Sequence, residues 1–283
     1  MTAPLRHAAV LGHPVVHSLS PALHRAAYRQ LGLDWDYQAV DVEPAGLSGF
    51  LDSLDSSWVG LSLTMPLKEK VLPLLTSVDA EAELLASVNT VLLGPGPTGV
   101  PSRHGANTDV TGLVALLVGA SVPVGTEVTV LGGGATARST LGALARRGAG
   151  PVTVCVRRAA SGDALVRLGL TLGLDVRWRA FDDAAAPLGA PLVVATVPAG
   201  ASDSLVSRVP HSAAGVLVDV LYQPWPTPLA AAWAAAGGVV VGGLELLVHQ
   251  AAEQVRLMTG RDVPVGLLRQ AGAEALAARG RPG

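Results

Sequence analysis

The feature that most constrains the fold is a β-branched run that passes directly into three glycines and then into a helix-forming segment. Val128–Leu131 predicts a short buried strand, Gly132–Gly134 predicts a tight turn, and a helix is expected to follow as far as Arg147. In such a turn the first glycine permits the sharp bend, and a later one lets the backbone approach a pyrophosphate. The unpaired N–H groups and the positive end of the new helix favour the same anion. The pattern therefore predicts a dinucleotide-binding unit, with Ala137 in place of the third fingerprint glycine; the alternative is an ordinary glycine-rich turn.

The end of the next predicted strand distinguishes between the two nicotinamide cofactors. A site for NAD usually has an Asp or Glu about 20 residues after the glycines, where it binds the ribose hydroxyls. This chain instead has Arg157 and Arg158 directly after the strand predicted at Val152–Val156. Guanidinium groups bind a 2′-phosphate bidentately, so the sequence favours NADP. The alternative is that both arginines only solvate the end of the strand.

Strands and helices alternate along most of the chain. Further apolar strands are predicted at residues 192–196, 216–220 and 239–241, which indicates an α/β protein whose parallel sheet has helices on both faces. A chain of 283 residues is long for a single core, so we expect two domains. Residues 1–110, in which 67–87 are expected to be mostly helical, should form an α/β substrate-binding domain, completed by C-terminal helices at 244–283. Residues 111–243 should form the Rossmann-like, NADP-binding domain.

Charge and hydropathy exclude several classes of partner. The net charge is −2 and there is no basic stripe, so nothing indicates a nucleic-acid partner. The apolar run at 229–248 carries one charge, Glu245, but two Gly–Gly pairs divide it, so we expect short soluble elements and no membrane span. The single cysteine, Cys155, cannot form an internal disulfide, which fits a reducing, cytoplasmic location. No histidine or cysteine spacing is typical of a metal site.

Four polar clusters in the first half of the chain each follow a predicted strand or open a helix. Ser18 and Ser20 stand at the start of a helix, where two hydroxyls and free N–H groups suit a small carboxylate. The remaining clusters are Thr64 with Lys68, Asn89 with Thr90, and Asn107 to Asp109. Taken one at a time, each has an ordinary structural explanation: a helix cap, a turn serine or a solvated lysine.

Together, the clusters occur in the order and spacing of a known family. In the first half the motifs are Gly12-x-Pro14-x-x-His17-Ser18-x-Ser20-Pro21-x-x-His24, Thr64-x-Pro66-x-Lys68, Val88-Asn89-Thr90 and Asn107-Thr108-Asp109. In the second half they are Thr196-Val197-Pro198, Asp219-Val220-x-Tyr222-x-Pro224, Thr227-Pro228-Leu229 and Gly243-Leu244-x-Leu246-Leu247-Val248-x-Gln250-Ala251. From about residue 9 to about residue 260 the chain resembles shikimate dehydrogenase.

This resemblance implies an activity and a set of roles. The activity is the reversible NADPH-dependent reduction of 3-dehydroshikimate to shikimate, a step of chorismate and aromatic amino acid biosynthesis. Lys68 would transfer the proton, with Asp109 as its partner. The implied substrate-binding residues are Ser18, Ser20, Thr64, Asn89, Asp109, Tyr222 and Gln250. The glycine turn and the two arginines, taken with the motifs of the second half, give the candidate cofactor-binding residues Gly132, Gly133, Gly134, Ala135, Thr136, Arg157, Arg158, Thr196, Val197, Val220 and Gly243.

Two alternatives remain open at this stage. One is a quinate/shikimate dehydrogenase with a broader substrate range or with NAD as cofactor, against which the paired serines and the two arginines weigh. The other is an NADP-binding regulator without catalysis, against which Lys68 and Asp109 weigh. The chain departs from the family pattern without losing a catalytic group, at Arg25, Ser62, Ala135, Thr136, Val156, Arg157, Arg158, Val220 and Leu246. The sequence leaves the oligomeric state open, a homodimer included.

Overall fold

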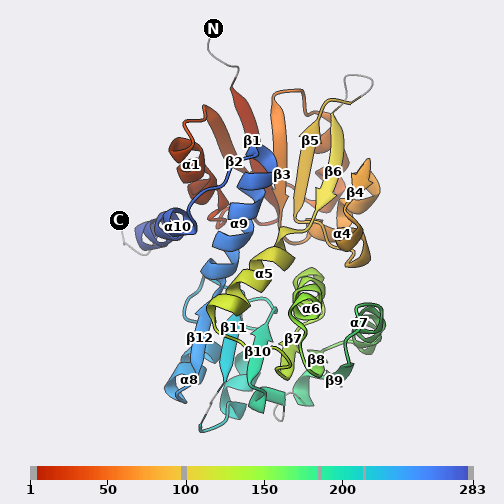
Figure 1. Ribbon diagram of the computed structural model, residues 1–283, viewed down its shortest axis with the longest axis vertical. Helices are drawn as coiled ribbons and strands as arrows, with labels where there is room; N and C mark the ends of the chain where they lie inside the picture. The colour runs from red at the N-terminus through yellow and green to blue at the C-terminus, as the bar shows by residue number, and fades with distance from the viewer. Residues whose placement is uncertain (1–4, 97–100, 184–186, 213–214, 280–283) are drawn as a thin grey trace. The chain divides into compact units, whose positions relative to one another are not determined.

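The computed structural model describes residues 5–96, 101–183, 187–212 and 215–279 (Figure 1). The chain divides into two compact units, one of Met1–Thr108 with Leu247–Gly283 and one of Asp109–Leu246. Each unit has its own six-stranded sheet, which confirms the predicted α/β class. Within the described ranges, no helix has the length and apolar character that a membrane crossing needs.

The first unit is built on a mixed sheet in the strand order β2-β1-β3-β5-β6-β4. β1 lies parallel to β2 and β3, whereas β5 is antiparallel to β3 and β6. The strands are β1 (Arg6–Gly12), β2 (Trp35–Asp41), β3 (Trp58–Leu63), β4 (Ser77–Val78), β5 (Thr90–Gly94) and β6 (Ser102–Ala106). The helices are α1 (Ser20–Gln30), α2 (Leu47–Asp52), α3 (Leu67–Lys70), α4 (Ala80–Leu84), most of α9 (Gly243–Thr259) and α10 (Val265–Arg279).

Alternating side chains of β1 enter two apolar layers, because successive side chains of a strand point to opposite faces. Ala9 and Leu11 belong to a buried cluster that includes Leu47 of α2. Ala8 and Val10 are also buried, and α1 contacts β1. The strand is therefore covered on both faces, which explains why it is apolar at every position from Ala8 to Leu11.

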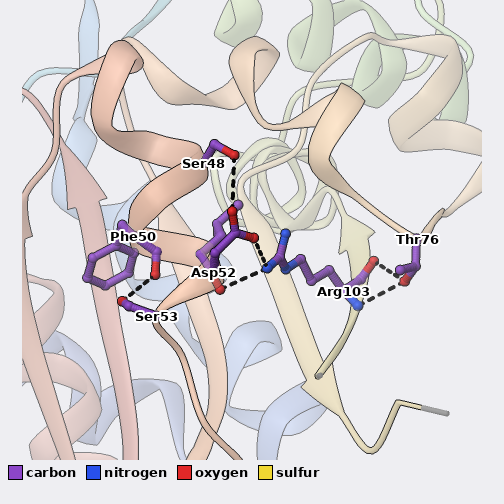
Figure 2. A network of polar contacts seen from close by, with 7 residues as sticks. Ser48, Phe50, Asp52, Ser53, Thr76 and Arg103 are labelled. Atoms are coloured by element: carbon purple, nitrogen blue, oxygen red, sulfur yellow. Dashed lines mark hydrogen bonds and ion pairs between the residues drawn. The ribbon is translucent and has the colours of Figure 1, made fainter. Parts of the chain in front are cut away.

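Arg103 on β6 ties the sheet to two other segments, to one through its side chain and to the other through its backbone (Figure 2). Arg103 Nη2 donates to the carbonyl oxygen of Leu51 and to Asp52 Oδ1, each at 2.8 Å. The hydrogen bond from Arg103 lowers the pKa of the Asp52 carboxyl. Arg103 N also donates to Thr76 Oγ1 at 2.8 Å, so the residues before β4 are held against β6.

The second unit contains a parallel sheet in the strand order β12-β11-β10-β7-β8-β9. Its strands are β7 (Val128–Leu131), β8 (Val152–Val156), β9 (Val176–Ala180), β10 (Leu192–Ala195), β11 (Val216–Asp219) and β12 (Val239–Gly242). Its helices are α5 (Thr108–Gly119, from Asp109 onward), α6 (Ala135–Arg147), α7 (Ala159–Thr171) and α8 (Pro228–Ala235). The strand order reverses between β7 and β10, and ligands of such sheets bind at the carboxyl ends of the strands beside this reversal. The predicted Rossmann-like sheet is confirmed.

The helical segment expected at residues 67–87 is divided into short pieces. It forms the short helices α3 and α4, separated by a 3-10 helix at Leu72–Leu74 and by β4. Pro73 lies within the 3-10 turn, and a proline interrupts the hydrogen-bond ladder of an α-helix. Thr76 N donates to the carbonyl oxygen of Arg103, so pairing with β6 replaces the helix.

Candidate functional site

Most of the predicted polar residues of the first unit gather at one edge of its sheet. β1 and β3 are parallel, so their carboxyl ends meet at this edge. β5 begins there and β6 ends there, because the two strands are antiparallel. Ser18 and Ser20 follow β1, Thr64 and Lys68 follow β3, and Asn89 immediately precedes β5.

Residues 13–19, between β1 and α1, form the serine loop. Ser20 is the first residue of α1, and Ser18 Oγ accepts a hydrogen bond from Ser20 N at 3.2 Å. Gly12 precedes the loop and has no room for a side chain, since an added Cβ would lie 2.3 Å from Thr64 Cγ2. The motif glycine therefore lets the end of β1 pack directly against Thr64.

Backbone hydrogen bonds place Lys68 beside Asn89. Val88 N donates to the carbonyl oxygen of Lys68 at 2.9 Å, and Leu63 N donates to the carbonyl oxygen of Asn89 at 2.8 Å. Leu67 N donates to the carbonyl oxygen of Thr64, which forms the turn between β3 and α3. The short helix α3 is therefore fixed against the start of β5. Lys68 is the second residue of this helix.

The side chain of Asn89 is the centre of a buried hydrogen-bond network. Its Oδ1 accepts from Thr108 N at 2.8 Å and from Thr90 Oγ1 at 2.9 Å. Its Nδ2 donates to Thr108 Oγ1 at 3.0 Å and to Gln250 Oε1 at 3.3 Å. Asn89 is thus bonded to one other predicted substrate residue, Gln250, and to Thr108, the residue before Asp109.

Gln254, which was not predicted from the sequence, extends this network. Its Nε2 donates to Thr90 Oγ1 at 3.0 Å, and its Oε1 accepts from Ser62 Oγ at 2.8 Å and lies 3.2 Å from His24 Nε2. Gln254 follows Gln250 by four residues on the same helix, so a shared helix face was the signal that could have identified it.

His24, a motif histidine without an assigned role, has a structural one here. Its ring stacks on Tyr37 with the centroids 4.0 Å apart, and burial lowers its pKa to about 3. The imidazole is therefore neutral at neutral pH, and its Nε2–H donates to Gln254 Oε1. Tyr37 Oη in turn donates to Ser62 Oγ at 2.6 Å, which completes a chain of buried polar groups under the site.

In the second unit, the three glycines of the β7–α6 turn meet different surroundings. Gly132 has a φ of +115°, and a Cβ added to it would lie 2.5 Å from Thr196 Oγ1. At Gly133 an added Cβ would lie 3.0 Å from Val156 Cγ1. At Gly134, the N-cap of α6, an added Cβ would meet nothing within 4 Å. Gly132 is required by its backbone conformation and packing, and Gly133 is tightly packed. Gly134 faces open space at a helix start, which fits the predicted pyrophosphate position.

The other predicted cofactor residues lie at the same edge of this sheet. Ala135 and Thr136 open α6, and Arg157 and Arg158 follow β8 with exposed side chains. Among the described residues, no carboxylate lies within ion-pair distance of either arginine. Thr196 and Val197 follow β10, and Thr196 Oγ1 donates to the carbonyl oxygen of Leu131 at 2.8 Å, which joins β10 to the end of β7.

The loop after β11 is closed by a buried carboxylate. Asp219 Oδ1 accepts from Leu221 N at 3.1 Å, and its Oδ2 accepts from Thr227 Oγ1 at 2.7 Å. Burial raises the pKa of the Asp219 carboxyl above its ordinary value. These bonds anchor a loop that contains Val220 and Tyr222. Tyr222 and Asp109 belong to the second unit, whereas the other predicted substrate residues belong to the first.

Gly243 packs directly on that loop. A Cβ added there would lie 2.0 Å from the carbonyl oxygen of Val220, and Gly243 N donates to the carbonyl oxygen of Leu221 at 3.0 Å. The motif glycine at the start of α9 is therefore required by a backbone contact. Nowhere in the described ranges do three His, Cys, Asp or Glu side chains gather in a way that could hold a metal ion.

Comparison with known proteins gives consistent matches over nearly the whole chain. Residues 10–91 match the shikimate dehydrogenase substrate binding domain, and residues 243–271 match the shikimate 5′-dehydrogenase C-terminal domain. The shikimate dehydrogenase (NADP(+)) of Citrifermentans bemidjiense is 35% identical, over 100% of this chain and 99% of that protein.

Two solved structures share the fold. The shikimate dehydrogenase of Mycobacterium tuberculosis has a TM-score of 0.84 and is 38% identical, over 95% of this chain and 99% of that one. The shikimate 5-dehydrogenase of Thermus thermophilus, solved in complex with NADP(H) and shikimate, has a TM-score of 0.82 and is 33% identical, over 95% and 99% of the two chains.

Proposed function

The chain belongs to the shikimate dehydrogenase family, and from that premise we propose that it catalyses the reversible NADPH-dependent reduction of 3-dehydroshikimate to shikimate, in chorismate and aromatic amino acid biosynthesis. The observation that carries the proposal is the gathering of Ser18, Ser20, Thr64, Lys68 and Asn89 at one sheet edge of the first unit. These residue types match the chemistry of a polyhydroxylated ring acid with a reducible carbonyl.

Lys68 is assigned the proton transfer. Reducing a ketone to an alcohol delivers a hydride to the carbonyl carbon and a proton to the carbonyl oxygen. The Lys68 ammonium donates a hydrogen bond to that oxygen, stabilises the negative charge that develops on it and then gives up its proton. In the reverse direction the neutral amine takes the proton from the shikimate hydroxyl. Asp109 is assigned two roles, to orient the ammonium and to bind a ring hydroxyl.

The substrate carboxylate is assigned to Ser18 and Ser20. Two hydroxyls at the start of α1 donate hydrogen bonds to it, and the helix start adds a favourable dipole. The ring hydroxyls are assigned to Thr64, Asn89 and Gln250, with Tyr222 at the carboxylate end. The network around Asn89 keeps its amide in one orientation, so little conformational entropy is lost when substrate binds.

The second unit is assigned the cofactor. When bound, NADPH supplies the hydride. Gly134, Ala135 and Thr136 at the start of α6 would bind the pyrophosphate, while Gly132 and Gly133 shape the turn. The 2′-phosphate is assigned to Arg157 and Arg158, and the nicotinamide end to Thr196, Val197, Val220 and Gly243.

We propose that the protein can form a homodimer, which light scattering would test. We also infer a cytoplasmic location. Burial raises the pKa of the Cys155 thiol to about 11, which keeps the thiolate fraction low and the side chain unreactive. This thiol needs no particular redox environment, so the location follows from the biosynthetic role of the family.

The test is an absorbance assay for reduced nicotinamide with the purified protein. Shikimate and quinate are each supplied with NADP and with NAD, in four separate reactions. The proposal predicts rapid reduction of NADP with shikimate and slow reaction in the other three. Faster turnover of quinate, or of NAD, would favour the quinate/shikimate alternative. NADP binding without turnover by the folded protein would indicate a regulator.

A further inference from the structure

The serine loop is held at both ends by charged side chains from other elements of the first unit. At its start, Asp41 at the end of β2 accepts hydrogen bonds from His13 Nδ1 at 2.6 Å and from Val15 N at 3.1 Å. The bond from His13 lowers the pKa of the Asp41 carboxyl and raises that of the imidazole. At the other end of the loop the charged partner is Arg279.

Arg279 lies in the last turn of α10, a helix that packs along α1. Its Nη1 donates to the carbonyl oxygen of His17 at 2.7 Å, and its Nη2 donates to the carbonyl oxygen of Ser18 at 2.9 Å. One planar guanidinium therefore holds two consecutive carbonyls of the loop. Bidentate bonding by a permanent cation fixes orientation as well as distance.

This contact determines which backbone groups the loop presents. The carbonyl and the N–H of a trans peptide point in opposite directions, so fixing the carbonyl of Ser18 also fixes the N–H of Leu19. Within the described residues, Leu19 N donates to no oxygen, whereas Ser18 N donates to Val15 O. A carbonyl oxygen turned toward the ligand would repel a carboxylate. Because Arg279 binds the carbonyl oxygens of His17 and Ser18, these two oxygens point toward the guanidinium.

We propose that Arg279 is a positioning residue for the substrate-carboxylate pocket. It acts through the backbone of Ser18: by orienting the two carbonyls it keeps Ser18 Oγ and Leu19 N–H arranged for an anion, and Asp41 fixes the opposite end of the loop. This inference rests on the proposed function, which assigns the carboxylate to Ser18 and Ser20.

The first test replaces Arg279 by Ala and compares Arg261→Ala as the matched control. Arg261 is also exposed and donates to a backbone carbonyl of the α1 region, that of Leu31 at 3.1 Å, but at the far end of α1. Arg279→Ala should raise the shikimate KM about three- to tenfold, with kcat and the NADP KM unchanged. Arg279→Lys, which keeps the charge but not the two-pronged geometry, should restore only part of the affinity. Arg261→Ala should leave all three constants near those of the unmodified protein.

The second test combines Arg279→Ala with Ser18→Ala. If Arg279 acts through Ser18, the two KM increases should be less than multiplicative in the double variant. An unchanged KM in Arg279→Ala, an equal rise in Arg261→Ala, or fully multiplicative effects would each overturn the inference. The proposed function would survive these outcomes if the unmodified protein oxidises shikimate with NADP. It fails, together with this inference, if the unmodified folded protein neither binds nor oxidises shikimate.

Discussion

Replacing the glycines of the β7–α6 turn one at a time should separate what the fold requires from what the cofactor requires. At Gly132 the φ of +115° is unfavourable for any residue with a side chain, and an added Cβ would lie 2.5 Å from Thr196 Oγ1. Backbone strain costs about 1–3 kcal/mol and overpacking costs a similar amount. Gly132→Ala should therefore lower the free energy of unfolding by about 2–5 kcal/mol, a large part of the roughly 5–15 kcal/mol typical of a folded protein.

Gly134→Ala should behave in the opposite way. Its φ of −92° suits any residue, and the added methyl meets nothing within 4 Å. The free energy of unfolding without cofactor should stay unchanged or rise by up to about 1 kcal/mol, because alanine restricts the unfolded chain. The methyl would nevertheless occupy the space that the pyrophosphate needs. NADPH should then bind at least about tenfold more weakly, a loss of about 1.4 kcal/mol.

Two measurements decide the matter: urea unfolding without cofactor, and titration of each variant with NADPH. A Gly134→Ala protein that binds NADPH as tightly as the unmodified protein would refute the assignment of the pyrophosphate to this turn. A Gly132→Ala protein as stable as the unmodified one would refute the packing argument.

Three further predictions concern the cofactor phosphate, the substrate carboxylate and acid stability. Replacing both Arg157 and Arg158 by Ala should raise the NADP KM at least about tenfold and leave the NAD KM nearly unchanged. Faster turnover with NAD than with NADP by the unmodified protein would contradict this prediction. Ser18→Ala should weaken shikimate binding by about 1–3 kcal/mol, the range for a hydrogen bond to a charged group, and equal binding by calorimetry would remove Ser18 from the pocket. His24 has a pKa of about 3 in the folded state against 6.5 when unfolded, so below pH 6.5 the unfolded chain takes up the proton first. Urea unfolding at pH 7 and pH 5 should therefore show about 2 kcal/mol less stability at pH 5 from this group, and His24→Gln should reduce that difference.

The predictable parts of the fold are those with strong local signals. Strands β7 and β8 are apolar, β-branched runs between glycine or proline turns, and the structure places both at the predicted residues. Helix α7 and strand β9 were not predicted. Gly162 interrupts the helical pattern of α7. A glycine is required at this position because Trp178 of β9 packs on it, and an added Cβ would lie 2.5 Å from the indole. Such a contact depends on the tertiary fold and leaves no local trace.

The same distinction applies to the site. The motif order was enough to name Ser18, Thr64, Lys68 and Asn89, and the strand directions explain why they share one edge. Gln254 stands outside the motifs. The helix face that it shares with Gln250 gave only its direction, because its partner Ser62 lies 192 residues away in the sequence. Which polar groups saturate one another inside a core depends on side-chain geometry, and sequence spacing does not encode it.

The kcat of Lys68→Met tests the central claim most directly. Methionine keeps the bulk of the side chain but cannot carry the proton, so kcat for shikimate oxidation should fall by about 10²–10⁴. NADPH affinity should stay near that of the unmodified protein, since the cofactor residues belong to the second unit, and thermal unfolding should show a folded variant. A folded Lys68→Met protein whose kcat lies within about threefold of the unmodified value would contradict the assignment of proton transfer to Lys68.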